Sequence, residues 1–171
     1  VVISCFFLGD NVAYAQVFPE VNTGKEEKRP KQVSPDQRKE KETLAVQYYR
    51  NRQYEKALPL FRELHKQHPS HFYYTYLFYC LTETEEFDEA EKLVKKQMKQ
   101  KQFKSSYQID LGYIYIKEGN PENAHKEFDK VIGDLPADKN YIIRIASTFM
   151  SRRQYEYAAK TYIKGRELLD E

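Results

Sequence analysis

The sequence lacks the motifs by which many enzymes are recognised. Its 171 residues contain no glycine-rich phosphate loop, no His-Glu-x-x-His helix and no nucleophile motif. The carboxylates are scattered at positions that fit the solvated outer faces of helices. We therefore expect this chain not to be an enzyme and to have no cofactor and no metal centre.

One group of histidines comes closest to a metal-binding pattern. His65, His68 and His71 lie three residues apart, and zinc readily accepts imidazole ligands. His68 directly precedes Pro69, however, so we expect the helix to end there and His71 to lie beyond a turn. Histidines in a last helical turn also complement the helix dipole without a metal. We interpret this pattern as structural.

Cysteine, long apolar runs and net charge are also scarce. The chain has 2 cysteines, and no apolar run reaches the ~18 residues that a membrane span requires. The 28 Lys and Arg residues nearly balance the 26 Asp and Glu residues, and a formal net charge of +2 is too small to indicate an acidic partner. Cys80 lies in an aromatic segment, where we expect a small core hydrophobe rather than a reactive thiol.

What the sequence does contain is a period. Ala57, Ala90, Ala124 and Ala158 recur at spacings of 33, 34 and 34 residues, each in a similar apolar frame. A period of about 34 residues is typical of stacked helical hairpins, in which each unit buries its apolar face only against its neighbours. Small residues at such positions allow two helices to cross closely.

The frame around these alanines is best seen in the third copy. It reads Leu111, Gly112, Tyr115, Ala124, Phe128, Val131 and Pro136. This frame resembles the tetratricopeptide repeat (TPR) family, whose pattern is L-G-x2-Y, then A-x3-F and a closing Pro. The resemblance covers residues 38–171 and is loosest in the second copy, where Phe78 replaces the small residue. It implies an all-α fold, a right-handed α-solenoid of about four tetratricopeptide-type helical hairpins.

The turns divide this region into repeats and helices. Gly119 suits a left-handed C-cap, Asn120 an N-cap and Pro121 the first position of a helix. The turns of the first and fourth repeats share the tetrapeptide Arg-Gln-Tyr-Glu. Repeats are predicted at about 38–70, 71–104, 105–138 and 139–171, and helices at about 38–51, 54–67, 71–84, 87–101, 105–118, 121–133, 138–151 and 154–169.

The N-terminal segment has a different composition. Residues 1–15 combine a short apolar run with the small-x-small site Ala13-Tyr-Ala15, which predicts a secretory signal peptide truncated at its start. Residues 16–37 are charged and interrupted by prolines, which predicts a disordered linker. We therefore expect an exported bacterial protein, periplasmic or envelope-associated. Two alternatives stay open: a frayed apolar terminus, and lipid attachment at Cys5 rather than cleavage.

In TPR proteins the first helix of each repeat lines a concave groove, so the resemblance also implies which residues face a partner. Projected onto these helices, the inward positions form an aromatic and aliphatic wall that suits an extended peptide or an amphipathic helix. The predicted partner-binding residues are Val46, Tyr49, Phe72, Tyr79, Ile109, Tyr113, Ile116, Ile143 and Met150.

These features predict a protein–protein interaction scaffold that binds a peptide or partner protein in an aromatic-rich concave groove. One alternative is the N-terminal interaction module of a larger enzyme or sensor that continues past residue 171. Another is a structural, self-assembling envelope component that associates through its C-terminal helix, where Tyr157, Ile163 and Leu168 would lack a following repeat. The lysine-rich segment 92–104 is expected to be a solvated convex face. It leaves peripheral membrane association open, whereas the secretory signal argues against nucleic acid.

The signal-peptide prediction can be tested by expression in a bacterium with an intact leader. We expect the protein outside the cytoplasm with Gln16 as its first residue, because signal peptidase cleaves after small-x-small sites. Mass spectrometry of the N-terminal peptide identifies the terminus. Cytoplasmic protein that retains residues 1–15 would contradict this prediction.

Overall fold

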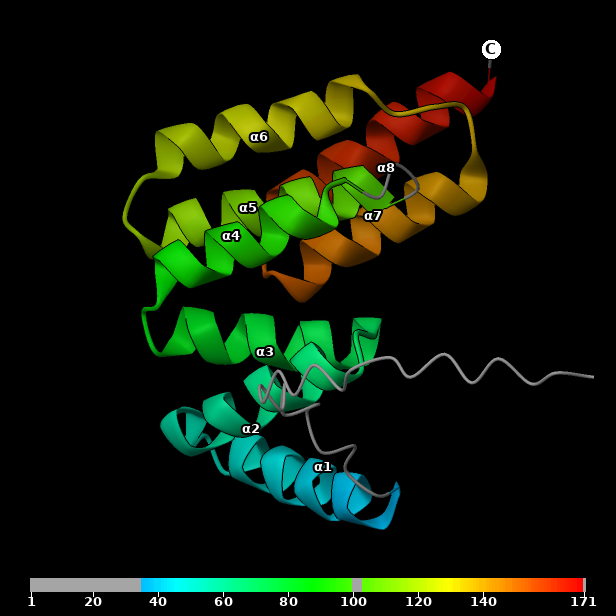
Figure 1. Ribbon diagram of the computed structural model, residues 1–171. Coiled ribbons are helices and arrows are strands. Elements are labelled where there is room, and N and C mark those ends of the chain that lie inside the picture. The colour runs from blue at the N-terminus through cyan, green and yellow to red at the C-terminus, as the bar shows by residue number, and fades with distance from the viewer. Residues whose placement is uncertain (1–34, 100–102, 171) are drawn as a thin grey trace, which may run out of the picture. The chain divides into compact units, whose positions relative to one another are not determined.

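A computed structural model describes residues 35–99 and 103–170 of the chain (Figure 1). These ranges contain α-helices and no β-strand. The helices are α1 (Pro35–Arg50), α2 (Tyr54–Gln67), α3 (His71–Glu83), α4 (Phe87–Gln97), α5 (Lys104–Lys117), α6 (Pro121–Gly133), α7 (Lys139–Ser151) and α8 (Tyr155–Asp170).

The predicted helix boundaries are confirmed with two exceptions. α1 begins at Pro35 rather than at residue 38, so the end of the segment predicted as a disordered linker is helical. α4 ends at Gln97 rather than at residue 101. The remaining ends agree to within one residue. The predicted signal peptide of residues 1–15 and the linker up to residue 34 lie outside the described residues.

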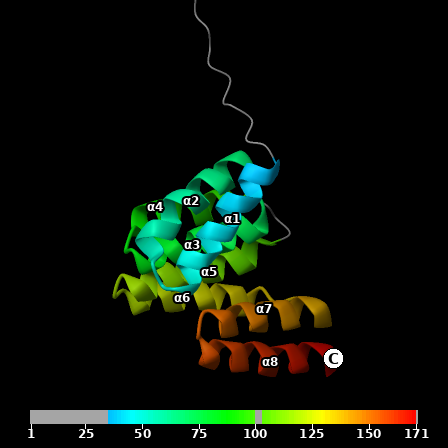
Figure 2. The same cartoon turned by 90° about the horizontal axis from the view of Figure 1, so that it is seen from below.

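The helices pair as hairpins and the hairpins stack. Consecutive helices pack together from α1 to α6, and α7 packs on α8. The last hairpin is joined to the third through contacts of α5 with α7 and of α6 with α8, and the two hairpins lie next to each other in both views (Figures 1 and 2). The described part of the chain is therefore an all-α solenoid of four helical hairpins, as its period predicts. None of these helices is both long enough and apolar enough to pass through a bilayer.

The four alanines that set the period occupy the places where helices approach closely. Ala57, Ala90 and Ala124 are fully buried, and Ala158 is nearly so. Gly112 serves the same purpose on α5, because its Cα faces the buried ring of Phe128 on α6. A larger side chain at these positions would force the helix pair apart.

The four turns inside the repeats have the same backbone conformation. Arg52, Glu85, Gly119 and Arg153 occupy equivalent positions, with left-handed φ values of 57°, 60°, 77° and 58°. After α5, the Gly119 amide donates to the Ile116 carbonyl and the Asn120 amide donates to the Tyr115 carbonyl. Together with the positive φ, these bonds define a Schellman motif, which satisfies the last free carbonyls of the helix. The predicted left-handed Gly119 and the Asn120 cap are confirmed.

Helix α3 is buried on several sides, as its nearly continuous apolar sequence predicts. Phe78, which replaces the usual small residue, is fully buried beside Cys80 and Leu81. Burial raises the pKa of the Cys80 thiol to about 12, so this cysteine stays protonated and acts as a small apolar side chain. Through the hydroxyls of Tyr73 and Tyr74, which donate to Glu42 on α1 and to Asp110 on α5, the helix also connects the first hairpin to the third.

Replacing Gly112 with alanine tests the close packing of α5 on α6. The added Cβ would lie 2.8 Å from Cδ1 of Phe128, and nearer still to Cε1, in a fully buried site. We expect the free energy of unfolding to fall by about 1–3 kcal/mol in urea denaturation, because overpacking strains the core.

Gly133→Ala is the matched control for this prediction. Its Cβ would meet no heavy atom within 4 Å, and Gly133 ends α6 without a left-handed φ. We expect unchanged stability or a gain of about 0.4–1 kcal/mol. Equal losses in the two variants would contradict the predicted close contact of α5 with α6.

Candidate protein-binding groove

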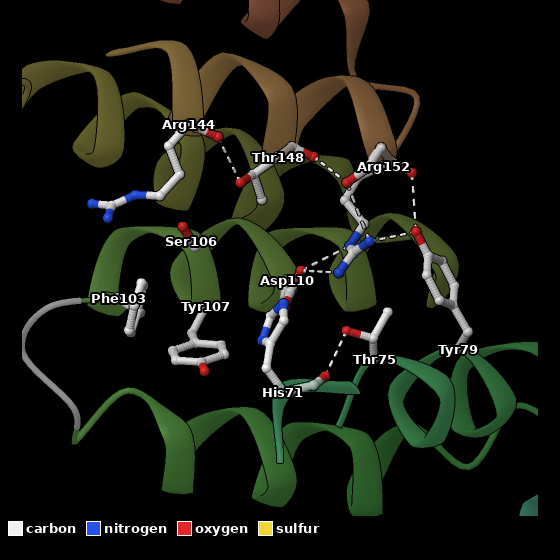
Figure 3. Close-up of a pocket in the computed structure, with 11 residues that line it drawn as sticks. His71, Thr75, Tyr79, Phe103, Ser106, Tyr107, Asp110, Arg144, Thr148 and Arg152 are labelled. Carbon is white, nitrogen blue, oxygen red and sulfur yellow. Dashed lines mark hydrogen bonds and ion pairs between the residues drawn. The ribbon is translucent and has the colours of Figure 1, made fainter. Parts of the chain in front are cut away.

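Two hollows adjoin on the face formed by the first helices of the repeats. We call the first the α3–α5–α7 pocket, after its main walls; it encloses about 550 Å3 (Figure 3). The second, the tyrosine pocket, encloses about 590 Å3 and also includes residues of α1 and of the turns. Tyr79 and Ser151 belong to both and separate them. We refer to the two pockets together as the groove.

The α3–α5–α7 pocket combines aromatic and polar walls. Its lining residues are His71, Thr75, Tyr79, Phe103, Ser106, Tyr107, Asp110, Arg144, Thr148, Ser151 and Arg152. The tyrosine pocket is lined by Tyr49, Arg52, Tyr54, Tyr79, Glu83, Tyr113, Lys117, Ser151 and Arg153.

A buried ion pair lies in the wall of the α3–α5–α7 pocket, next to the shared residues Tyr79 and Ser151. Asp110, in the middle of α5, meets Arg152, which follows α7 (Figure 3). Arg152 Nη2 and Nε lie 2.6 Å and 2.7 Å from Asp110 Oδ1, and the Tyr74 hydroxyl donates to Oδ2 at 2.6 Å. Both oxygens of this buried carboxylate are therefore satisfied by fixed donors, as a buried charge requires.

The Arg152 guanidinium also joins the second repeat to the fourth. Its Nη1 donates to the Tyr79 hydroxyl, and that hydroxyl donates to the Ser151 carbonyl at 3.1 Å. The guanidinium lies 4.8 Å from the ring centroid of Phe78 and 4.6 Å from that of Tyr79, within cation–π range. We call this set of contacts the Arg152 bridge.

Opposing effects act on the pKa values of the two charged groups in the bridge, Asp110 and Arg152. Burial raises the pKa of the Asp110 carboxyl, while Arg152 and the Tyr74 hydroxyl oppose that rise. Burial lowers the pKa of Arg152, but Asp110 and Tyr79 outweigh this effect, and the net shift is upward. Arg152 therefore stays a cation, and its charge is neutralised within the wall.

Several of the sequence-predicted groove residues lie in these hollows. Tyr49, Tyr79 and Tyr113 line the tyrosine pocket. Val46 and Phe72 line a further hollow between α1 and α3.

On the last two helices of the predicted groove wall, α5 and α7, the placement of four residues differs from the prediction. Ile109 is fully buried in the core shared by α5 to α8, so its assignment to the groove is wrong. Ile116 is half-buried against that core. Ile143 and Met150 are 43% and 49% exposed, yet the residues of α7 that line the pocket are their neighbours along the helix.

The sequence reasoning missed several charged residues of the groove, among them Asp110, Arg152 and the two turn arginines Arg52 and Arg153. A signal for Asp110 was present, since it is an isolated carboxylate in the otherwise apolar segment Ile109–Ile114. The arginines lie in turns, for which helical periodicity carries no information about direction.

Of the three histidines with metal-ligand spacing, one lies in the groove and the others do not. His71 lines the α3–α5–α7 pocket, whereas His65 faces α4, where burial and Lys96 lower its pKa. No group of three metal-ligating side chains is found in the described ranges.

The outer surface of α8 differs in part from the prediction. Ile163 is 53% exposed, but Tyr157 is buried, so the expectation that Tyr157 forms an uncovered seam is wrong.

Comparisons with known proteins give structural neighbours only. No protein-family model matches the chain. No curated protein sequence matches it either. Among solved structures, MamA 41-end from Desulfovibrio magneticus RS-1 is similar with a TM-score of 0.46 and 15% identity, covering 77% of this chain and 75% of that one. MamA of strain MSR-1 is similar with a TM-score of 0.46 and 18% identity, covering 80% of each chain. The four stacked hairpins themselves define the class: a TPR-like helical-repeat protein.

The Arg152 bridge makes a prediction for stability. Asp110→Leu leaves the Arg152 guanidinium buried without its counter-ion, and we expect the free energy of unfolding to fall by about 3–5 kcal/mol. Adding Arg152→Met removes the orphaned charge and should restore much of that loss. Urea denaturation of both single variants and the double variant measures the coupling.

The Glu83–Lys117 pair is the control, because its nitrogen–oxygen distance of 2.8 Å is similar but both side chains are about one-third exposed. Its disruption by Glu83→Leu should cost about 0–1 kcal/mol. An Asp110→Leu variant as stable as Glu83→Leu would show that the bridge does not hold the repeats together.

Proposed function

We propose that this chain is a protein-interaction scaffold, rather than an enzyme, and that it binds a peptide or an extended segment of a partner in the groove. The observation that carries the proposal is the adjacency of two hollows whose walls come from the first helices of all four repeats. Hollows of about 550 Å3 and 590 Å3 are of the size that ligand sites in proteins have.

The chemistry of the walls favours a polypeptide ligand. Tyrosines provide large contact areas with little loss of side-chain entropy and can bond to backbone amides and carbonyls. Tyr49 and Tyr113 are half-buried, so each is held by the fold and still presents surface to the groove. Residues of this kind are the common anchors of protein interfaces.

The Arg152 bridge supports the proposal in a second way. It fixes Tyr79 to the fourth repeat and so holds the shared wall of both pockets before any ligand arrives. A preorganised site avoids the entropic cost of ordering side chains on binding. We also propose that the scaffold acts in the bacterial envelope, on the basis of the signal-peptide pattern in residues 1–15.

A displayed library of random peptides, selected against the full chain, tests the proposed groove. Ser106→Trp obstructs the α3–α5–α7 pocket, and Tyr113→Ala removes an anchor from the tyrosine pocket. We expect the combined variant to lower the affinity of the selected peptides by at least about tenfold, measured by fluorescence polarisation, since truncated anchors commonly cost ~2 kcal/mol.

The control is Lys92→Gln combined with Lys96→Gln, two exposed positions on α4 that line neither pocket. This variant should bind like the unaltered chain. Selected peptides that lose affinity for the lysine variant and keep it for the groove variant would place binding on α4 instead.

A further inference from the structure

The repeated tetrapeptide Arg-Gln-Tyr-Glu brings two arginines to one pocket. It occupies residues 52–55 and 153–156, in the turns of the first and the fourth repeat. Although these turns are far apart in the sequence, Arg52 and Arg153 both line the tyrosine pocket. The stacking of the hairpins therefore places equivalent residues of the end repeats around the same hollow.

Both arginines adopt a backbone conformation that favours glycine. Their φ values are 57° and 58°, and the equivalent position of the third repeat is Gly119. Non-glycine residues seldom adopt this region, because the Cβ approaches the following carbonyl. Strained positions of this kind cluster at functional sites. Because Glu85 of the second repeat has the same conformation, a role for the two arginines rests on their place in the tyrosine pocket rather than on φ alone.

The charges of the tyrosine pocket are unevenly compensated. Glu83 pairs with Lys117 at 2.8 Å, and Glu85 also acts on Lys117, so this lysine is already neutralised. Among the described residues, no carboxylate forms an ion pair with Arg52 or Arg153. The pocket therefore has two cationic groups available to a ligand.

The uncharged polar groups of the pocket are mainly donors as well. Within the described part of the chain, the hydroxyls of Tyr49, Tyr54 and Tyr113 have no hydrogen-bond partner. Burial raises the pKa of Tyr49 to about 12 and raises the pKa of Tyr113 too, so both keep their protons. The Ser151 carbonyl already accepts a bond from Tyr79.

We propose that the tyrosine pocket binds side-chain carboxylates of an acidic segment in the partner protein, with Arg52 and Arg153 as the groups that recognise them. Guanidinium groups form charge-assisted, two-pronged hydrogen bonds to carboxylates, and tyrosine hydroxyls add further donors. The proposal rests on the proposed function and names the chemistry of the partner. The net charge of +2 conceals this site, because the cations are gathered locally rather than in excess over the chain.

A peptide fits the pocket better than a nucleic acid does. Affinity for nucleic acid depends on many phosphate contacts along an extended basic surface. Here Arg52 and Arg153 lie around a single hollow, and Glu83 in the same lining pairs with Lys117, so the pocket offers no such extended basic surface. Residues 16–34 of the same chain contain four basic and three acidic side chains, so this segment is not a complementary ligand.

Synthetic peptides test the proposal directly. The probes are fluorescein-labelled peptides of equal length in which alanine alternates with glutamate, glutamine or lysine. With the full chain at low salt, we expect the glutamate peptide to bind at least about tenfold more tightly than the glutamine peptide, and the lysine peptide to bind least. Higher salt should weaken the glutamate complex, because salt screens exposed charges.

Two variants of the arginines separate recognition from folding. Arg52→Gln with Arg153→Gln should lower affinity for the glutamate peptide by about tenfold, while Lys92→Gln with Lys96→Gln, which removes the same charge from α4, should change it less than about twofold. Arg52→Gly with Arg153→Gly should cause the same loss of binding with no loss of thermal stability, because glycine suits the left-handed turn.

The proposal is overturned if the glutamine peptide binds as tightly as the glutamate peptide, or if the α4 lysines matter as much as the arginines. It is also overturned if a single-stranded oligonucleotide binds at these arginines more tightly than the glutamate peptide. Library peptides without acidic residues that still require Ser106 and Tyr113 would refute the acidic partner alone. Library peptides that are insensitive to Ser106→Trp and Tyr113→Ala would refute the groove itself.

Discussion

The buried pairing of Asp110 with Arg152 joins the fourth repeat to the third and, through Tyr79, to the second. In an ideal solenoid each repeat contacts only its immediate neighbours, and its curvature follows from small rotations between them. Here the Arg152 bridge adds direct contact between the second repeat, through Tyr79, and the fourth. A guanidinium that is only 7% exposed requires all its partners in place, because an unpaired buried charge is strongly unfavourable. The ion pair therefore makes the stacking angle of the last hairpin a condition of stability.

The same pair also contributes to the boundary between the two pockets of the groove. Arg152 lines the α3–α5–α7 pocket and bonds to Tyr79, one of the two residues that separate this pocket from the tyrosine pocket. Its charge is satisfied within the wall, so it contributes rigidity and aromatic contacts rather than recognition. Arg52 and Arg153 take no part in the bridge and line the tyrosine pocket. Two neighbouring residues, Arg152 and Arg153, thus differ in environment, because Arg152 is buried in an ion pair whereas Arg153 is exposed at the pocket.

The repeat architecture could be predicted from the sequence because it depends on local, periodic information. The alanine spacing, the turn residues and the closing prolines each act within one hairpin, and they gave nearly all helix boundaries. The groove depends instead on how hairpins rotate against one another, which periodicity does not encode. On α5, Ile109 is buried and its neighbour Asp110 meets Arg152; on α7, Arg144 and Ser151 line the pocket in place of their neighbours Ile143 and Met150. The long-range ion pair of Asp110 with Arg152 joins residues far apart in the sequence and leaves no repeat signature.

The left-handed position in the turn of each repeat is occupied by different residue types. All four require a left-handed residue, and Gly119 meets this requirement with no steric cost. The third repeat thus has the residue that this backbone conformation favours, and Gly119 lines neither pocket. The first and fourth repeats retain arginine at the same backbone conformation, and both arginines line the tyrosine pocket. In the second repeat the equivalent residue is Glu85, which lines neither pocket, so the left-handed backbone by itself does not mark a binding position. What distinguishes the two arginines is that the stacking of the hairpins brings equivalent turn residues of the first and fourth repeats to the same hollow, a relation that no single repeat contains.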